Sequence, residues 1–413
     1  MTNLAVEPLI VSRPEHWGVT RLKAALARRE VRKGEDDVPL MSLASTGAVR
    51  PRSEGADRQQ PSEDAIPRYL VAEPGDLIVN PMWLAGGGIG VSQLTGAVSP
   101  DYRVFRSRGE LLPAYAHHLL RSVPFLEQYR LFVRADTTFD RRVQQVDLDN
   151  LRIPVPPLDE QRRIADFLDD QVPRIESSIR QVDSSRSLVE ERTSAYLGEQ
   201  LASVGEATTP LSSLATIVDT EHRTAPETPG GEHWSAGTSS IRHGYVLPDK
   251  LTEVDKAAYA AWTRRSRPTP GDVLLTREAP VGQAAILKEE HARIAIGQRV
   301  VLLKPHRPAL VGGFLLGYLL SPLFSRAVEL LTQGSLHPHL NMSDIYRLRL
   351  PAPALSAQRL VAEHVDLALH QRSDLLGALS RQGALLLERK RALITAAVTG
   401  EFDVSTASGR NVA

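Results

Sequence analysis

Apolar residues recur every seven positions in two long stretches of the chain. The first stretch has this spacing at Leu168, Ile175, Val182, Val189 and Tyr196, with Val172 and Ile179 at the alternate positions. The second has it at Val365, Leu379, Leu386 and Leu393, with Leu369, Leu376 and Ala397 at the alternate positions. A seven-residue repeat of this kind is typical of the seam of a coiled coil. Each predicted helix has about 40 residues and a length of roughly 60 Å.

The two predicted helices share their phase and length, which bears on how they bury their seams. A long helix with polar edges does not bury an apolar seam alone, so we expect the two to pack on each other as an antiparallel coiled coil. The alternative is that each packs locally on its own globular part. Pro173 is expected to kink the first helix or divide it. Polar or small residues interrupt the seams, namely Arg186, Thr193, Arg372, Gly383 and Lys390.

The segment that precedes the first predicted helix recurs before the second. The twelve residues from Leu151 to Arg162 recur as the twelve from Leu348 to Arg359, at an offset of 348 − 151 = 197 positions. Upstream, Pro74-Gly-Asp before an apolar run recurs as Pro270-Gly-Asp, which is typical of a turn that enters a strand. Two features at nearly the same offset and in the same order predict two similar halves, related as a pseudo-two-fold internal repeat.

The remaining parts of the chain lack long heptads and mix short apolar runs with turn signals. The runs at 77–80, 102–105, 273–276 and 300–303 are predicted strands. Residues 113–120 are a predicted helix, and 314–320 are either a short helix or a buried strand. The fold class that follows is α+β, with two globular parts that alternate with two long helices.

The composition excludes some kinds of chemistry but does not identify the function. The chain has 413 residues, no cysteine and a formal net charge of zero, so disulfides and cysteine-based metal sites are excluded. The segment from His291 to Arg359 contains eight lysines and arginines but only two acids, so this region could face phosphates. No apolar run is long enough for a membrane span and no signal peptide is evident, so we expect a soluble, cytoplasmic protein without a membrane partner.

Several weak motifs have simpler interpretations. The run Gly86-Gly-Gly-Ile-Gly lacks the helix and acid of a dinucleotide site, and no phosphate-binding loop is present. Asn80-Pro-Met-Trp is similar to the Asn-Pro-Pro-aromatic motif of amino-methyltransferases, but Met82 breaks it, so a loop after a strand is favoured. His337 and His339 have no further ligand at metal spacing, so no metal site is predicted.

The doubled proline segment followed by heptads resembles the specificity subunits of type I restriction-modification enzymes. The resemblance is carried by Ile153-Pro-Val-Pro-Pro-Leu-Asp-Glu-Gln, by Leu348-Arg-Leu-Pro-Ala-Pro-Ala-Leu-Ser-Ala-Gln, by the stretch from Gly334 to Ile345 and by Trp17-Gly-Val-Thr-Arg-Leu. It covers essentially the whole chain. The second copy departs from the first because Ala357 stands where the first copy has Glu160.

The resemblance implies an organisation and a set of partners. It implies target-recognition domains at 1–157 and 204–354, spacer helices at 158–203 and 355–400, and a tail at 401–413. Each domain would read one half of a bipartite, asymmetric site in double-stranded DNA. The helices would set the gap and bind two methyltransferase subunits, which we expect to complete the imperfect seams, and motor-nuclease subunits would join. The chain would be non-catalytic, with S-adenosylmethionine, ATP and magnesium on the partner subunits.

Candidate contact residues follow from side-chain chemistry, because basic and polar side chains on loops contact phosphates and base edges. Their simpler role is as solvated surface residues. The candidates for DNA in the first half are Arg50, Arg52, Arg58, Arg103, Arg106, Arg134, Thr138 and Arg141. Those in the second half are Arg242, His243, Arg264, Arg265, Arg277, Gln298, Arg299, His337, His339 and Asn341. The candidates for partner binding are Gln161, Arg162, Gln358 and Arg359, whose simpler role is to cap the helices and pack on the proline segments.

Two other classes of protein compete with this interpretation. One is a duplicated coiled-coil scaffold that does not read DNA, and the basic tilt of residues 291–359 argues mildly against it. The other is a free-standing nuclease or methyltransferase, and the missing cofactor motifs argue against that.

Overall fold

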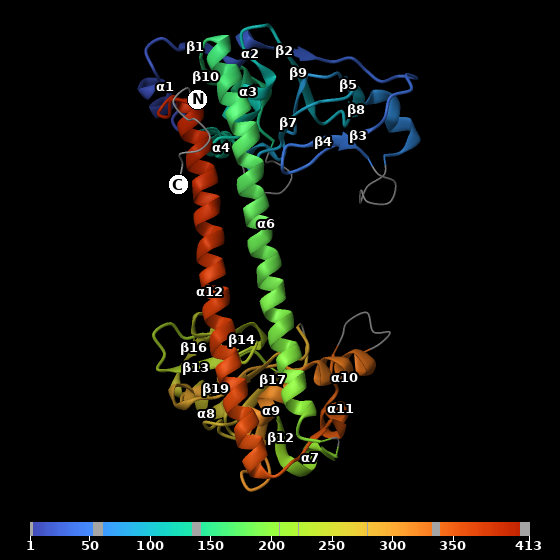
Figure 1. The fold of residues 1–413 in the computed structure, drawn as a ribbon, viewed down its shortest axis with the longest axis vertical. Coiled ribbons are helices and arrows are strands. Elements are labelled where there is room, and N and C mark those ends of the chain that lie inside the picture. The colour runs from blue at the N-terminus through green and yellow to red at the C-terminus, as the bar shows by residue number, and fades with distance from the viewer. Residues whose placement is uncertain are drawn as a thin grey trace. The chain divides into compact units, whose positions relative to one another are not determined.

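The computed structural model describes residues 3–52, 61–133, 142–205, 207–221, 223–278, 280–332 and 339–404 (Figure 1). The chain divides into two compact units. Unit 1 comprises Met1–Gln181 with Gln382–Ala413, and unit 2 comprises Val182–Arg381. The division cuts both long helices, so each helix contributes to both units. The domain boundaries expected from the sequence, which treat the helices as separate segments, stay a prediction.

Unit 1 is built on a four-stranded antiparallel sheet. Its strand order is β2 (Leu26–Arg29), β9 (Arg103–Ser107), β6 (Leu77–Val79) and β7 (Ile89–Val91). Three antiparallel pairs accompany it, formed by β1 (Gly18–Arg21) with β10 (Arg152–Val155), β3 (Met41–Leu43) with β4 (Val49–Pro51), and β5 (Leu70–Ala72) with β8 (Gly96–Val98). Its short helices are α1 (Glu7–Ser12), α2 (Leu22–Ala25), α3 (Pro113–Leu120), α4 (Val123–Phe132) and α5 (Gln145–Asp149).

Unit 2 repeats this sheet. Its strand order is β12 (Ala215–Asp219), β20 (Val300–Pro305), β17 (Val273–Thr276) and β18 (Ala284–Ile286), again antiparallel. A second sheet has the order β16 (Thr252–Val254), β13 (His233–Ala236), β19 (Ile294–Ile296), and β11 (Thr208–Pro210) pairs with β21 (Arg349–Pro351), and β14 (Ile241–Arg242) with β15 (Tyr245–Val246). Its short helices are α7 (Leu211–Leu214), α8 (Lys256–Trp262), α9 (Gly312–Leu319), α10 (Pro322–Thr332) and α11 (Met342–Arg347).

The two long helices have the extent that the heptads predict. Helix α6 runs from Leu158 to Ala202 and α12 from Leu355 to Thr399, each with 45 residues. Of the two outcomes expected of Pro173, division of the first helix is wrong, because α6 continues through it, and a kink there stays a prediction. Pro173 removes one backbone hydrogen bond, but the neighbouring seam residues Leu168 and Ile175 are buried, and packing rather than local propensity holds a helix of this kind together.

The helices pair in antiparallel fashion within each unit. In unit 2, Arg372 of α12 lies 3.3 Å from Glu190 of α6, and His364 is 2.6 Å from Gln200, so the numbers fall along one helix as they rise along the other. In unit 1, Lys390 of α12 pairs with Glu176 of α6. The predicted seam is therefore a shared one, and two of the cations that interrupt it are matched by acids on the facing helix.

Each unit has its own large core, and the long helices help to build both. The core of unit 1 joins the sheet to Ile164, Ala165 and Leu168 of α6 and to Ala397 and Val398 of α12. The core of unit 2 joins its sheet to other parts of the same helices, at Leu197, Leu201, Val361, Val365 and Leu369. The local packing that the sequence left as an alternative therefore occurs together with helix pairing.

The Pro-Gly-Asp turns form the same structure in both units. The side chain of Asp76 accepts the amide of Glu73 at 2.8 Å, and that of Asp272 accepts the amide of Thr269 at 2.8 Å. The central glycines, Gly75 and Gly271, have φ of 87° and 89°, which a side chain would strain. The repeat in sequence is thus a repeat in backbone geometry.

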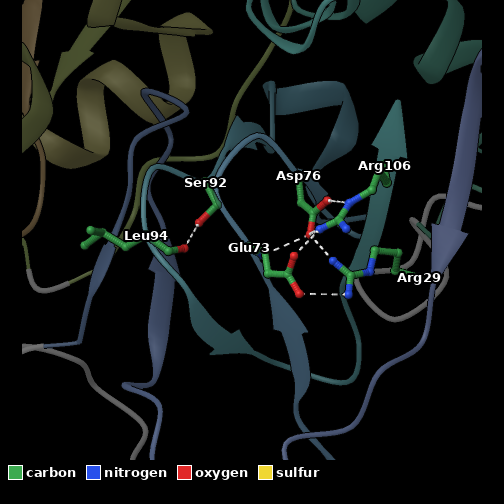
Figure 2. Close-up of polar contacts among 6 residues, drawn as sticks. All are labelled: Arg29, Glu73, Asp76, Ser92, Leu94 and Arg106. Atoms are coloured by element: carbon green, nitrogen blue, oxygen red, sulfur yellow. Dashed lines mark hydrogen bonds and ion pairs between the residues drawn. The ribbon is translucent and has the colours of Figure 1, made fainter. Parts of the chain in front are cut away.

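A charged network fastens the first of these turns to its sheet (Figure 2). Asp76, which is fully buried, accepts hydrogen bonds from Arg29 of β2 at 2.9 Å and from Arg106 of β9 at 2.8 and 3.0 Å. Glu73 pairs with Arg29 at 3.1 Å and with Arg106 at 2.6 Å. In the same figure, the Ser92 hydroxyl closes the next turn by donating to the carbonyl of Leu94 at 2.6 Å. In unit 2, Lys304 of β20 takes the place of the arginines, 2.7 Å from Asp272.

This network makes the stability of unit 1 depend on pH in acid. Hydrogen bonds from Arg29 and then Arg106 lower the pKa of Glu73 from 4.5 to about 2. A carboxyl group whose pKa is lower in the folded state stabilises that state above pH 4.5, and this contribution disappears as pH falls toward 2. We expect Glu73→Gln to lower the melting temperature at pH 7 and to have little effect near pH 2. An equal effect at both pH values, measured by circular dichroism, would contradict this assignment.

Candidate nucleic-acid interface

One end of the four-stranded sheet in unit 2 gathers basic residues from loops that are far apart in the sequence. Arg277 follows β17, and its side chain pairs with Asp219, the last residue of β12, at 3.2 Å. The amide of Arg277 donates to the carbonyl of Arg299, which precedes β20, at 2.8 Å. Arg299 has a φ of 66° and pairs with Glu278 at 2.9 Å. These contacts hold two loops side by side at the sheet end.

The end of helix α8 adds two arginines and the loop before β20 adds an amide. Arg265 donates to the carbonyl of Asp219 at 2.8 Å, and Arg264 is 3.7 Å from Glu221. Gln298 donates to the hydroxyl of Thr224 at 2.9 Å. We call the set Arg264, Arg265, Arg277, Gln298 and Arg299 the basic loop surface.

The segment before α11 reaches the same sheet end. The amide of Leu340 donates to the carbonyl of Arg277 at 2.9 Å, and the Arg277 side chain donates back to the carbonyl of Leu340 at 3.0 Å. His339 and Asn341, on either side of Leu340, are exposed. Asn341 begins α11 with a capping box that includes Asp344. Seven of the ten candidates from the second half are therefore brought together.

The other three candidates for DNA contact in the second half are not placed at this sheet end. Arg242 donates to the carbonyls of Thr238 and Ile241, both at 2.6 Å. His243, with a φ of 46°, lines a cavity of about 220 Å³ together with Glu190 and Arg372 of the long helices. Burial, followed by the charge of Arg372, lowers the pKa of His243. His337 lies outside the described residues.

In unit 1 two candidates make their contacts within the chain. Arg103 is 8% exposed and donates to the carbonyl of Val143 at 3.0 Å, and burial lowers its pKa to about 10. Arg106 is held by Asp76 and Glu73 in the turn network. Both guanidinium groups bond within the chain, which is a structural role, and as DNA contacts the two arginines stay predictions.

The remaining candidates of unit 1 are only partly placed. Arg50 is exposed on β4, and Arg52, which follows that strand, is half-buried and donates to Ser42 at 3.3 Å. Arg58, Arg134, Thr138 and Arg141 lie outside the described residues.

The glutamines that open the long helices are buried. The Gln161 carbonyl accepts the amide of Leu112 at 2.7 Å, and its amide group donates to the carbonyls of Glu110 and Pro156, both at 2.8 Å. Gln358 repeats all three bonds in unit 2, at 2.9 to 3.0 Å. These side chains tie the helix start to its globular part, which is the simpler role that the sequence allowed. Arg162 and Arg359, the next residues, are exposed and stay candidates for partner contact.

Removing either glutamine side chain is expected to loosen the helix start. Gln161→Ala or Gln358→Ala should lower the free energy of unfolding by about 2–3 kcal/mol, because buried amide and carbonyl groups lose their partners. Gln371→Ala, at an exposed position of α12, serves as the control and should change it by less than about 0.5 kcal/mol. Denaturant titration measures both, and equal effects would contradict the role.

The loop between β6 and β7, which the sequence identified only as a loop after a strand, exposes two large apolar side chains. It contains Asn80, Met82 and Trp83, and the last two are 41% and 55% exposed. The amide of Val143, which follows the Arg134–Arg141 segment, donates to the carbonyl of Pro81 at 3.1 Å, as Leu340 does to Arg277 in unit 2. The signal that could have found it is a methionine and a tryptophan next to three glycines, where a strand has already ended.

Among the described residues, the structure offers no group of three or more histidines, aspartates or glutamates that could hold a metal ion. Within that part of the chain, no single helix is long and apolar enough to cross a membrane, although α9 and α10 pass that test as a pair bent by 57°.

The architecture, two α+β parts with two long helices, has a counterpart among solved structures. A structure titled "Structural basis underlying complex assembly and conformational transition of the type I R-M system" matches with a TM-score of 0.70 and 21% identity, over 94% of this chain and 99% of that chain. The HsdS subunit from Thermoanaerobacter tengcongensis is also 21% identical, over 94% and 98%, with a TM-score of 0.49. The first match confirms the predicted fold class.

The sequence of residues 132–182 matches the family model of the type I restriction modification DNA specificity domain. This segment contains the first proline segment and the start of α6, which carried the resemblance. The resemblance to type I specificity subunits is thereby confirmed.

Proposed function

We propose that this chain is the DNA sequence-recognition subunit of a type I restriction-modification enzyme. The observation that carries the proposal is the match to the DNA specificity domain at residues 132–182, within a fold unit that occurs twice. The basic loop surface at the sheet end of unit 2 supports it, because arginines on loops are the usual contacts to phosphates. The scaffold alternative is not favoured, since the matching family model describes a DNA specificity domain.

The proposal includes a division of labour between subunits. Each globular part reads one half of a bipartite asymmetric site, and two unlike readers in one chain give an asymmetric site where a homodimer gives a palindrome. The long helices set the gap and bind two methyltransferase subunits, and motor-nuclease subunits complete the assembly. The chain itself is non-catalytic, and the partner subunits bind S-adenosylmethionine, ATP and magnesium. Its place is the cytoplasm, where its DNA is.

The test is to express the chain with a methyltransferase subunit and to map methylated bases in the host genome by single-molecule sequencing. We expect a split, asymmetric motif with a fixed gap. Exchanging residues 1–157 for those of a second specificity subunit should change one half of the motif and leave the other half unchanged. An intact complex that methylates no motif would overturn the proposal and favour the scaffold.

A further inference from the structure

The loop between β6 and β7 of unit 1 holds two large apolar side chains in an ordered frame. The side chain of Asn80 accepts the amide of Met82 at 3.1 Å, and the backbone carbonyl of Asn80 accepts the amide of Trp83 at 3.1 Å. The carbonyl of Trp83 accepts the amides of Gly86 and Gly88 at 3.1 and 3.0 Å. The loop is therefore held by its backbone and by the side chain of Asn80, independently of the two exposed side chains.

The indole has a fixed position on this frame. A Cβ added at Gly86 would lie 2.6 Å from Nε1 of Trp83, so the ring lies close against that glycine. Leu84, the next residue, is 1% exposed and anchors the loop in the core. More than half of the tryptophan is nevertheless exposed, at 55%, beside a methionine at 41%.

The neighbours of the loop include aromatic and basic side chains. Tyr102 bonds with the side chain of Asn80 and lies within electrostatic reach of Arg52. Arg142, which is exposed, precedes the residue that bonds to Pro81. In unit 2 the corresponding loop carries Arg277 and Glu278 and belongs to the basic loop surface. The loop after this strand thus carries an apolar pair in unit 1 and a charged pair in unit 2.

We infer that Met82 and Trp83 form an apolar contact with the bases of the half-site that unit 1 reads, while unit 2 approaches its half-site through arginines. Apolar side chains such as methionine contact thymine methyl groups or wedge between base steps, and an aromatic ring stacks on bases. The inference rests on the proposed function and adds the residues and the kind of contact that determine specificity in the first half-site.

The test uses the full chain in complex with its methyltransferase subunits and a duplex that carries the mapped motif. We expect Trp83→Ala, and Met82→Ala to a lesser degree, to weaken binding roughly tenfold. In the Trp83→Ala complex, changing a base pair in the first half-site should weaken binding less than it does in the wild type. The effect of a change in the second half-site should stay the same, and Trp83→Phe should keep most of the wild-type discrimination.

Leu94→Ala is the matched control, because Leu94 is 50% exposed at the turn beyond the other end of β7. It should bind like the wild type. A folded Trp83→Ala complex that discriminates both half-sites as the wild type does would overturn the inference and leave the proposed function standing. A wild-type complex without any sequence preference would overturn both.

Discussion

Replacing Asp76 by alanine is expected to lower the free energy of unfolding by about 3 kcal/mol, because it removes the buried carboxylate that pairs with Arg29 and Arg106. Asp76 is fully buried and accepts Arg29, Arg106 and the amide of Glu73. Arg29 is 17% exposed and cannot fully rehydrate, whereas Arg106 is 44% exposed and partly can. We therefore take the lower end of the range for a broken buried pair. Denaturant titration, with hydrogen exchange to locate the effect in unit 1, measures this loss.

Asp101→Ala is the control for this prediction. Asp101 pairs with Arg142 at 2.9 Å, but the two side chains are 61% and 42% exposed. Such a surface pair contributes between zero and about 1 kcal/mol. If Asp76→Ala and Asp101→Ala have similar effects, the turn network does not hold the sheet together.

Removing two charges from the basic loop surface is expected to weaken DNA binding strongly. Each phosphate contact contributes about 0.9 to the slope of log affinity against log salt, so Arg264→Gln with Arg299→Gln should lower the slope by about 1.8. Relative to 1 M salt, this corresponds to roughly 60-fold weaker binding at 0.1 M. The two arginines pair with Glu221 and Glu278, and their own side chains are 78% and 53% exposed. Such pairs are weak, so a phosphate can replace the acid.

The matched control changes two arginines at the opposite end of the same strands. Arg307 follows β20 and Arg267 precedes β17, and both are exposed. Arg267→Gln with Arg307→Gln removes the same charge, and we expect the salt slope to stay unchanged. Binding to a duplex with the mapped motif, titrated between 0.05 and about 0.3 M salt, separates the two variants. Equal slopes for both would show that this sheet end does not face DNA.

Local patterns made much of the fold predictable. A seven-residue repeat depends only on the geometry of one helix, so it located α6 and α12 correctly. The Pro-Gly-Asp repeat located the strands β6 and β17 in the same way, because a turn with a glycine at positive φ is defined by its own residues. Antiparallel pairing and the two-part α+β architecture followed from these elements.

The candidate site was less predictable, because the partner of a charged side chain lies elsewhere in the chain. Arg106 lies within β9 and Arg299 just before the equivalent strand β20, yet the Arg106 side chain bonds to Asp76, which is 30 positions away. Gln161 is a polar residue near the start of a helix. The residues around it in the sequence do not indicate that Glu110 and Leu112 contact it and bury its side chain. Trp83 was interpreted only as part of a loop, because the exposure of its side chain is set by the packing around that loop.

The composition of the two cores has a consequence for the order of folding during synthesis. Unit 2 is a single stretch of chain, whereas the core of unit 1 includes Ala397 and Val398, and the hydroxyl of Tyr115 donates to the carbonyl of Val398 at 3.3 Å, across 283 positions. Contacts of such long range form late. The part of unit 1 that leaves the ribosome first therefore has an incomplete core until unit 2 and the end of α12 have been synthesised. During that time its apolar surface is exposed, and we expect chaperones to protect it from aggregation.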